Sequence, residues 1–372
     1  MRLSDHIAAQ CGSEEDIGGI FSMTALAIRH AQRFELSDDV ARAAYNLTRM
    51  KPSSLLNAMP LCRLPYRRIW LEWRGGITSA IIPRERRRDI AVAPDPLKMG
   101  CLIEADASGQ RGTMTFAWVH KARPGISGVN ISPLGSLFNW EESGIVHKDA
   151  MDEITRRYPT KETLKTPLGL LDMILAMRYS SELSDAAAKH WMEKSSFHMW
   201  HQFAGVASER RALQTLGNHH MPFVPPHTLG FLKWCAELLF PQGDAGLDNF
   251  MKKVVQQSWE MDIEGEPPFC EAVIAMMNSR NAIEHRDVDL TGLNHARAKR
   301  GRPLFMPYRT THLRLSQAQT RAFRAGLLSR EDAGRHSVRG HFKIRKTGIY
   351  WWSPFLRGDP TKPLKRQEYV VS

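Results

Sequence analysis

Apolar side chains recur at helical spacing near the start of the chain. Between residues 13 and 31 the apolar positions are Ile17, Ile20, Phe21, Ala25 and Ile28. This spacing predicts an amphipathic helix, and a second helix is predicted after Ser37, a residue type that caps helix N-termini. Pro52 ends the second helix, because proline cannot continue one, and a short third helix is expected just after it. Residues 1–64 are therefore expected to form a helical segment.

In the next part of the chain, apolar residues occur at every second position, a spacing that is typical of half-buried strands. Alternation over residues 69–73 predicts a first strand. Residues 99–106 and 113–119 are predicted to pair as a hairpin, since a turn rich in Ser and Gly joins them. Residues 126–140 contain two glycines and a proline, and they are expected to form a loop or a broken strand. A small antiparallel sheet is thus predicted within residues 65–148.

Helical spacing returns between residues 149 and 290. Prolines divide this part of the chain into short units, so a packed region of several helices is predicted there. The expected helices span residues 168–178, 183–213, 228–240, 247–260 and 269–280.

The last part of the chain contains both helical spacing and strand alternation of apolar residues. A helix is predicted over residues 293–299, a strand over 311–315 and a second helix over 316–328. Residues 338–345 and 349–356 are predicted to pair as a hairpin, with Gly348 taking the positive φ that a tight turn requires. These parts predict an α+β fold with a helical N-terminus, a small antiparallel sheet, a helical middle and a basic C-terminal α/β module ending in a β-hairpin. The corresponding segments are residues 1–64, 65–148, 149–290 and 291–372.

Charge is distributed unevenly along the chain. Residues 291–372 hold 18 Lys and Arg against four Asp and Glu, whereas residues 1–290 hold 33 against 35. The formal net charge of +12 therefore arises entirely from the C-terminal module. Such asymmetry suggests a polyanionic partner for the basic part, since clustered Lys and Arg attract phosphates.

Composition narrows the class of protein. With 42% hydrophobic and 24% charged residues, the chain is expected to be globular rather than disordered or fibrous. Its longest apolar run is about six residues, far below the roughly 18 that span a bilayer. Acidic residues follow the N-terminus where a signal peptide would be apolar, so we expect a cytoplasmic protein with no membrane partner. The five cysteines are widely spaced, and neither a disulfide framework nor a zinc motif is predicted.

Alternation within the predicted hairpin places basic side chains on one face. Positions 339, 341, 343 and 345 lie together, and only one of Trp351 and Trp352 can face them. Cations neutralise phosphates without reading sequence, and an exposed indole can stack on an unpaired base. Helix 293–299 supplies a second basic element. The predicted nucleic-acid-binding residues are Arg297, Lys299, Arg300, Arg302, Arg339, His341, Lys343, Arg345, Lys346, Trp351, Trp352 and Arg357.

Enzymatic motifs are sparse, and no phosphate-binding loop, dinucleotide fingerprint, zinc-protease or serine-hydrolase motif occurs. Histidines are grouped at positions 190, 198 and 201 and again at 219, 220 and 227, but an isolated pair at i, i+3 spacing is more often part of a core. Glu104 and Asp106, with Asp95, resemble the carboxylates of a Mg²⁺-dependent nuclease. The lysine expected after them is absent, because Ser108 stands there. The acidic group at 284–289 is interpreted as a helix end and a loop.

Two stretches of the C-terminal module resemble a family of uncharacterised proteins encoded by bacteriophages and prophages. They are residues 293–304, Leu-Asn-His-Ala-Arg-Ala-Lys-Arg-Gly-Arg-Pro-Leu, and residues 338–343, Val-Arg-Gly-His-Phe-Lys. Weaker similarity extends to residues 68–73 and 131–135. The chain departs from the family at Asn294-His295, where an Asn-Arg pair is expected. The resemblance implies a mobile-element context in a bacterial host cell, and it carries over no catalytic residues.

The leading hypothesis is a non-enzymatic, phage-associated protein that binds the phosphate backbone of nucleic acid, with DNA favoured over RNA. The main alternative is a protein–protein interaction module that docks an acidic phage or host protein through the same face. A metal-dependent nuclease is the third possibility. No catalytic residue, metal site or cofactor is predicted, and the sequence leaves the oligomeric state open.

Overall fold

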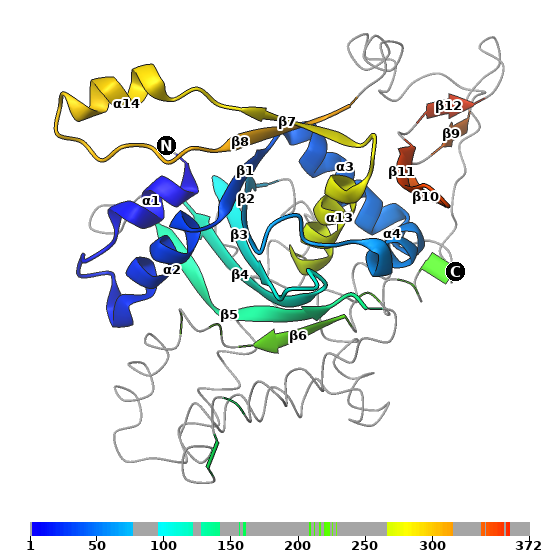
Figure 1. Cartoon of the computed structure of the whole chain (residues 1–372), viewed down its shortest axis with the longest axis horizontal. Helices are drawn as coiled ribbons and strands as arrows, with labels where there is room; N and C mark the ends of the chain where they lie inside the picture. Colours follow the sequence, from blue (N-terminus) through cyan, green and yellow to red (C-terminus); the bar gives the residue numbers. More distant parts are fainter. Residues whose placement is uncertain are drawn as a thin grey trace, which may run out of the picture.

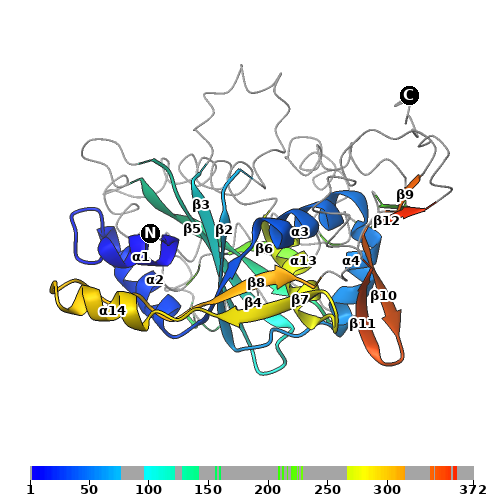
Figure 2. The ribbon, with the colours of Figure 1, turned by 90° about the horizontal axis from the view of Figure 1, so that it is seen from above.

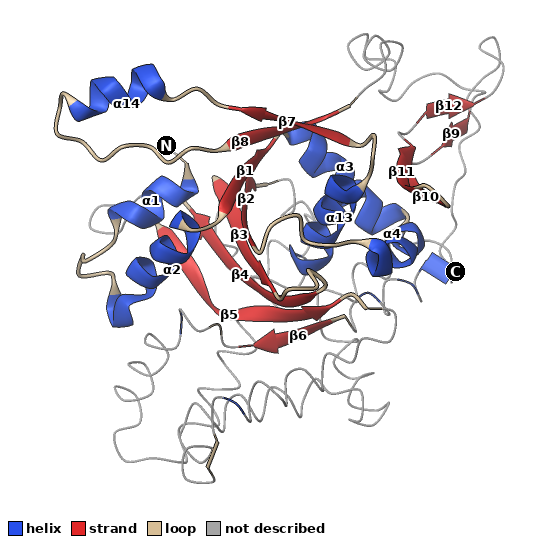
Figure 3. Cartoon of the chain, in the orientation of Figure 1, coloured by secondary structure: helices blue, strands red, loops and turns tan. Residues whose placement is uncertain are grey.

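The structure is a computed structural model, and it describes residues 2–76, 96–121, 128–141, 266–314 and 340–352. Shorter described pieces are residues 156, 159–160, 208–209, 212, 216, 219–223, 225, 228, 336–338 and 355–357. These residues form helices and a mixed sheet, as Figure 3 shows, and the predicted α+β class is confirmed.

An eight-stranded sheet forms the centre of the molecule (Figure 1). Its strand order is β6-β5-β4-β3-β2-β1-β8-β7. Strand β1 runs parallel to both of its neighbours, β2 and β8, and the other pairs are antiparallel. The strands are β1 Gln32–Leu36, β2 Arg68–Arg74, β3 Lys98–Ala105, β4 Arg111–Val119, β5 Val129–Asn139, β6 His220–Phe223, β7 Ile283–Asp287 and β8 Arg309–Leu313.

The sheet is larger than the small antiparallel sheet expected within residues 65–148. That segment supplies β2 to β5, but the other four strands come from the segments before and after it. The side-chain pattern does not reveal β1, because this strand has only five residues, of which Phe34 and Leu36 are apolar. Its interior position in the sheet depends on backbone pairing with β2 and β8, which are distant in sequence.

Strand β5 occupies the stretch that was expected to be a loop or a broken strand. Pro133 lies within it, although proline has no N–H to donate to a neighbouring strand. The pairing of β4 with β5 shifts register at this place, between the Thr115–Gly135 and Ala117–Ile131 pairs. This bulge accommodates the missing donor and allows the strand to continue.

Helices cover both faces of the sheet (Figure 1). On one face, α1 and α2 bring Leu3 and Ile7 against Trp70 and Leu102. On the other face, α3, α4 and α13 pack against Leu71 and its neighbours, since successive side chains of β2 point to opposite faces. The described α-helices are α1 Leu3–Ala9, α2 Ile20–Arg29, α3 Asp38–Met50, α4 Pro52–Ala58, α13 Glu266–Asn278 and α14 Thr291–Ala298, with 3₁₀ turns at Ile17–Gly19 and Met59–Leu61.

Local sequence signals set several helix boundaries. The Ser37 hydroxyl caps α3 and accepts a hydrogen bond of 3.4 Å from the backbone amide three residues on. Pro52 is the first residue of α4, a position at which a missing N–H carries no penalty. The helix expected over residues 13–31 is shorter, because Gly18 and Gly19 have positive φ and α2 begins after them.

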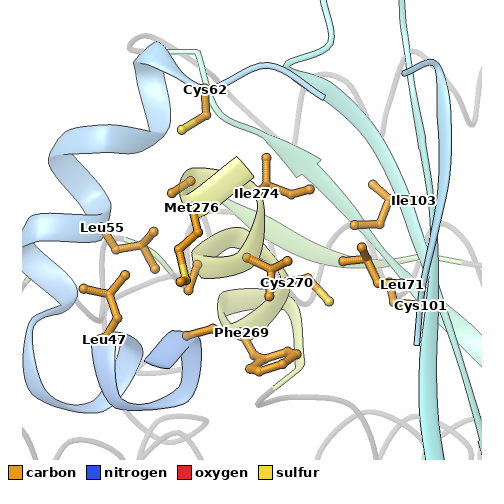
Figure 4. Packing of buried hydrophobic residues seen from close by; sticks show 14 of the residues in the cluster. Leu47, Leu55, Cys62, Leu71, Cys101, Ile103, Phe269, Cys270, Ile274 and Met276 are labelled. Carbon is orange, nitrogen blue, oxygen red and sulfur yellow. The ribbon is translucent and has the colours of Figure 1, made fainter. Parts of the chain in front are cut away.

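Helix α13 lies in the middle of the larger core (Figure 4) and corresponds to the helix expected at residues 269–280. Phe269, Cys270, Ile274 and Met276 are fully buried among residues of α3, α4 and the sheet. Apart from Glu266 and Glu271 the helix has no charged residue, which is typical of such burial. The other helices predicted between 149 and 265, and the helix at 316–328, lie almost wholly outside the described residues.

The predicted C-terminal hairpin is present. Strand β10, His341–Arg345, pairs antiparallel with β11, Gly348–Trp352, and Gly348 has a φ of 126°. The pairing resumes in a separate two-stranded sheet, formed by β9, His336–Val338, and β12, Phe355–Arg357. The hairpin is therefore interrupted rather than continuous.

The described helices include no membrane span, and three of the four described cysteines are buried. No described helix combines the length and apolar character needed to cross a bilayer. Cys62, Cys101 and Cys270 are buried free thiols, and Cys11 is free and exposed. Burial raises the pKa of the Cys62 thiol well above its ordinary value, which makes this thiol unreactive.

Candidate nucleic-acid interface

One face of the β10–β11 hairpin is fixed to the body of the molecule. Phe342, Ile349 and Trp351 are buried against the core that contains α4 and α13. The Ser54 hydroxyl accepts from the Phe342 amide at 2.6 Å, and the Asn281 carboxamide bonds both the amide and the carbonyl of Trp351, at 2.8 and 2.9 Å. These contacts hold one face of the hairpin against the body of the molecule.

The opposite face of the hairpin is basic and aromatic. His341 stands opposite Trp352 in the strand pairing, and Lys343 stands opposite Tyr350. The Lys343 ammonium lies 4.8 Å from the centre of the Trp352 ring, and the Arg345 guanidinium carbon lies 5.6 Å from the centre of the Tyr350 ring. We call these five residues the hairpin face. Cation–π contacts of this kind hold the charged groups beside the rings.

The two consecutive tryptophans have opposite environments. Trp352 is 38% exposed, whereas Trp351 is 4% exposed and packs against Phe342 with ring centres 5.2 Å apart. Trp351 was among the predicted binding residues, but it packs in the core, and a buried ring cannot reach a base.

Tyr350 and Arg280 also lie at this surface, although the sequence prediction did not include them. The Tyr350 hydroxyl bonds Thr347, and this bond, together with the charges of Arg280 and Arg345, lowers the pKa of Tyr350. Strand alternation could have identified Tyr350, which lies two residues from Trp352. Nothing in the sequence could have identified Arg280, because it follows α13 and reaches the hairpin only through the fold.

The basic residues near α14 belong to a different structure, an arm formed by residues 288–308 between β7 and β8. The Asn294 carboxamide donates to the Phe305 carbonyl at 3.0 Å and accepts from its amide at 2.8 Å. Arg297 stacks over the Phe305 ring at 4.0 Å and donates to the Pro303 carbonyl at 2.6 Å. Arg297 thus shapes the arm, and the arm's exposed cations are Lys299, Arg300 and Arg302.

The arm and the hairpin face lie at opposite ends of the molecule (Figure 2). Arg2 and Arg33 fasten the arm beside α1 and α2, through hydrogen bonds to the carbonyls of Met306 and Pro307. The hairpin instead packs on α4 and α13. The predicted binding residues therefore form two surfaces separated by the sheet, and not a single patch.

The remaining predicted residues are only partly placed. Lys346 is exposed in the turn between β10 and β11. Arg339 lies outside the described residues, and for Arg357 only the backbone position in β12 is described.

The carboxylates considered for a nuclease site have partners of their own. Glu104 forms an ion pair with Arg68 at 2.5 Å. Asp106 accepts from the amide and hydroxyl of Ser108 and pairs with Arg111 at 3.0 Å. Burial acts to raise the pKa of Asp106, but the Ser108 hydrogen bonds and the Arg111 charge lower it by more. This carboxylate is consequently a turn-forming group.

The second acidic group is also engaged. Glu284 pairs with Arg286, and Asp287 pairs with Arg309 at 2.7 Å. Asp95 lies outside the described residues. Among the residues that the structure does describe, no three His, Cys, Asp or Glu side chains are arranged to hold a metal ion.

Two of the candidate histidines form a buried cluster with Glu271 of α13. His220 Nε2 lies 3.0 Å from Glu271 Oε1, and its Nδ1 lies 3.2 Å from Ser136 Oγ. His219 Nδ1 lies 3.8 Å from the same carboxylate oxygen. Burial acts to raise the pKa of Glu271, but the two imidazoles lower it by more. Ser136 and Glu271 are fully buried, so this cluster joins β5, β6 and α13 rather than receiving a substrate. The other candidates, His190, His198, His201 and His227, lie outside the described residues.

No protein-family model, curated protein or solved structure matches this chain.

Proposed function

We propose that this protein binds nucleic acid, with DNA favoured over RNA, by contacting the phosphate backbone through the hairpin face. The observation that carries the proposal is the exposed Trp352 ring beside Lys343, on a hairpin whose other face is fixed by buried contacts. A fixed surface loses little conformational entropy when it binds a partner. The resemblance to phage and prophage proteins is consistent with such a protein acting on phage or host nucleic acid.

Electrostatics support the proposal. In the described part of the chain, no acidic side chain pairs with Lys343, Arg345 or Lys346, and all three are exposed. Unpaired cations can displace the counterions of a phosphate backbone, which makes binding strongly salt-dependent. Arg280 adds a fourth cation near Tyr350. The surface thus provides charge for phosphates and rings for bases.

The test is a charge reversal within the hairpin face. The variant Lys343→Glu/Arg345→Glu should weaken binding to labelled DNA at least tenfold, because two phosphate contacts become repulsive. Fluorescence anisotropy at about 50 and 200 mM salt would measure the affinity and its salt dependence.

A matched control reverses the charge of one Arg and one Lys outside the hairpin. Arg29, in the last turn of α2, and Lys121, after β4, are both exposed. The Arg29→Glu/Lys121→Glu variant has the same net charge as the hairpin variant and should bind DNA nearly as well as the unchanged protein. If both variants lost the same affinity for DNA, the net charge of the protein alone would explain its attraction to DNA. No binding at low salt would overturn the proposal and favour an acidic protein as the partner of this face.

A further inference from the structure

The spacing of the two rings on the hairpin face restricts the kind of nucleic acid it can take. Tyr350 and Trp352 are two residues apart on one strand, so their Cα atoms are about 6.8 Å apart at 3.4 Å per residue. Bases along one strand of a duplex follow one another every ~3.4 Å. Neighbouring bases could therefore stack on both rings only after they separate from each other.

Cations alternate with the rings across the hairpin face. Lys343 contacts the Trp352 ring diagonally, and Arg345 contacts the Tyr350 ring in the same way. A nucleic-acid strand lying along this face would meet the Trp352 ring and then the Tyr350 ring, with Lys343 and Arg345 beside them. This arrangement suits an extended backbone with its bases turned toward the protein, as in single-strand binding surfaces.

Duplex DNA offers a rival mode, because a two-stranded ribbon can enter the major groove. Base edges in that groove are read by Arg, Lys, Asn, Gln and similar polar groups. The centre of the hairpin face instead carries two aromatic rings. An aromatic ring stacks on the flat surface of a base. In a paired and stacked duplex, the neighbouring base pairs cover these surfaces.

We propose that the hairpin face binds an unpaired stretch of nucleic acid in preference to duplex, with Trp352 as the main stacking platform. This inference rests on the proposed function and specifies its ligand. Stacking on one aromatic side chain corresponds to an affinity factor of about 5 to 150.

The experiment compares the full chain and its variants on a labelled oligothymidine of about 20 nucleotides and on a blunt duplex of the same length, a length chosen to exceed the footprint of one hairpin. Trp352→Ala should weaken binding of the single strand about 5- to 150-fold and change duplex binding little. Trp352→Phe should retain most of the affinity, since it keeps a ring. Ile344→Ala is the matched control, because Ile344 is 44% exposed on the opposite side of β10. Circular dichroism and thermal unfolding would confirm that each variant folds.

The outcomes separate this inference from the proposed function. Tight binding of the single strand, lost in Trp352→Ala and kept in Trp352→Phe, supports the inference. Tighter binding of duplex, or equal losses on both ligands, would overturn the single-strand preference and leave nucleic-acid binding in place. Failure to bind either ligand at low salt would overturn both.

Discussion

Trp351 and Trp352 show how strongly the fold distinguishes adjacent residues. Both are tryptophans on β11, yet one packs in the core and the other is exposed beside Lys343. Strand geometry requires them to point to opposite faces, and this could be predicted from sequence. Which of them points inward could not be predicted, because it depends on Phe342, Ser54 and the other groups beneath the hairpin.

Glu271 is a second residue whose significance depends on its neighbours. We predict that Glu271→Gln destabilises the protein by about 3 kcal/mol near neutral pH, because it removes the buried carboxylate that His219 and His220 face. Urea denaturation would measure the difference in free energy of unfolding.

The same variant should show a defined pH dependence. The pKa of Glu271 is lowered from 4.5 to about 2 in the folded chain, chiefly by His220 acting against the effect of burial. A lowered pKa contributes stability that is present above the unfolded value and is lost as pH falls through the folded value. The stability difference between the two proteins should therefore shrink between pH 4.5 and about 2. A difference that stays constant over this range would refute the ion pair.

At the scale of elements, an Asn carboxamide bonds both backbone groups of another residue at two places in the chain. Asn281 bonds the amide and carbonyl of Trp351, and Asn294 bonds the amide and carbonyl of Phe305. Each carboxamide bonds backbone groups as a strand partner would, and it fixes a segment that lies outside the central sheet. The first anchors the hairpin, and the second shapes the α14 arm.

We predict that Asn281→Ala loosens the hairpin and weakens DNA binding several-fold. The loss of two partly buried hydrogen bonds, each contributing roughly 1 kcal/mol, would let β11 move from its position. Hydrogen exchange of the β11 amides and anisotropy with DNA would measure the two effects. The matched variant Asn294→Ala should raise exchange only within residues 288–308. Slow exchange in β11 of Asn281→Ala would show that the buried side chains alone hold the hairpin.

At the scale of the whole molecule, the basic C-terminal quarter of the sequence is part of the central sheet. Strand β8 lies between β1 and β7, although it belongs to the segment that begins at residue 291. The arm and the hairpin lie at opposite ends of the molecule (Figure 2). The basic segment thus includes a strand of the central sheet as well as the two basic surfaces.

We predict that a fragment of residues 1–290 fails to unfold cooperatively. Without β8, strand β7 loses its partner and strand β1 has an open edge, which favours aggregation. A fragment of residues 1–335 keeps β8 and should unfold cooperatively, with a midpoint lowered by loss of the hairpin contacts. Size-exclusion chromatography and thermal unfolding of both fragments would test this. A monomeric, cooperative 1–290 fragment would contradict the place of β8 in the sheet.

Features that act over a few residues could be predicted from the local residue types. They are the Ser37 cap, the Gly348 turn, the mainly apolar character of α13 and the excess of charge after residue 290. Four other features are seen only in the fold: the order of the strands, the burial of Trp351, the position of Arg280 beside Tyr350 and the separation of the two basic surfaces. These four depend on backbone pairing and packing between segments far apart in sequence, which no local pattern encodes.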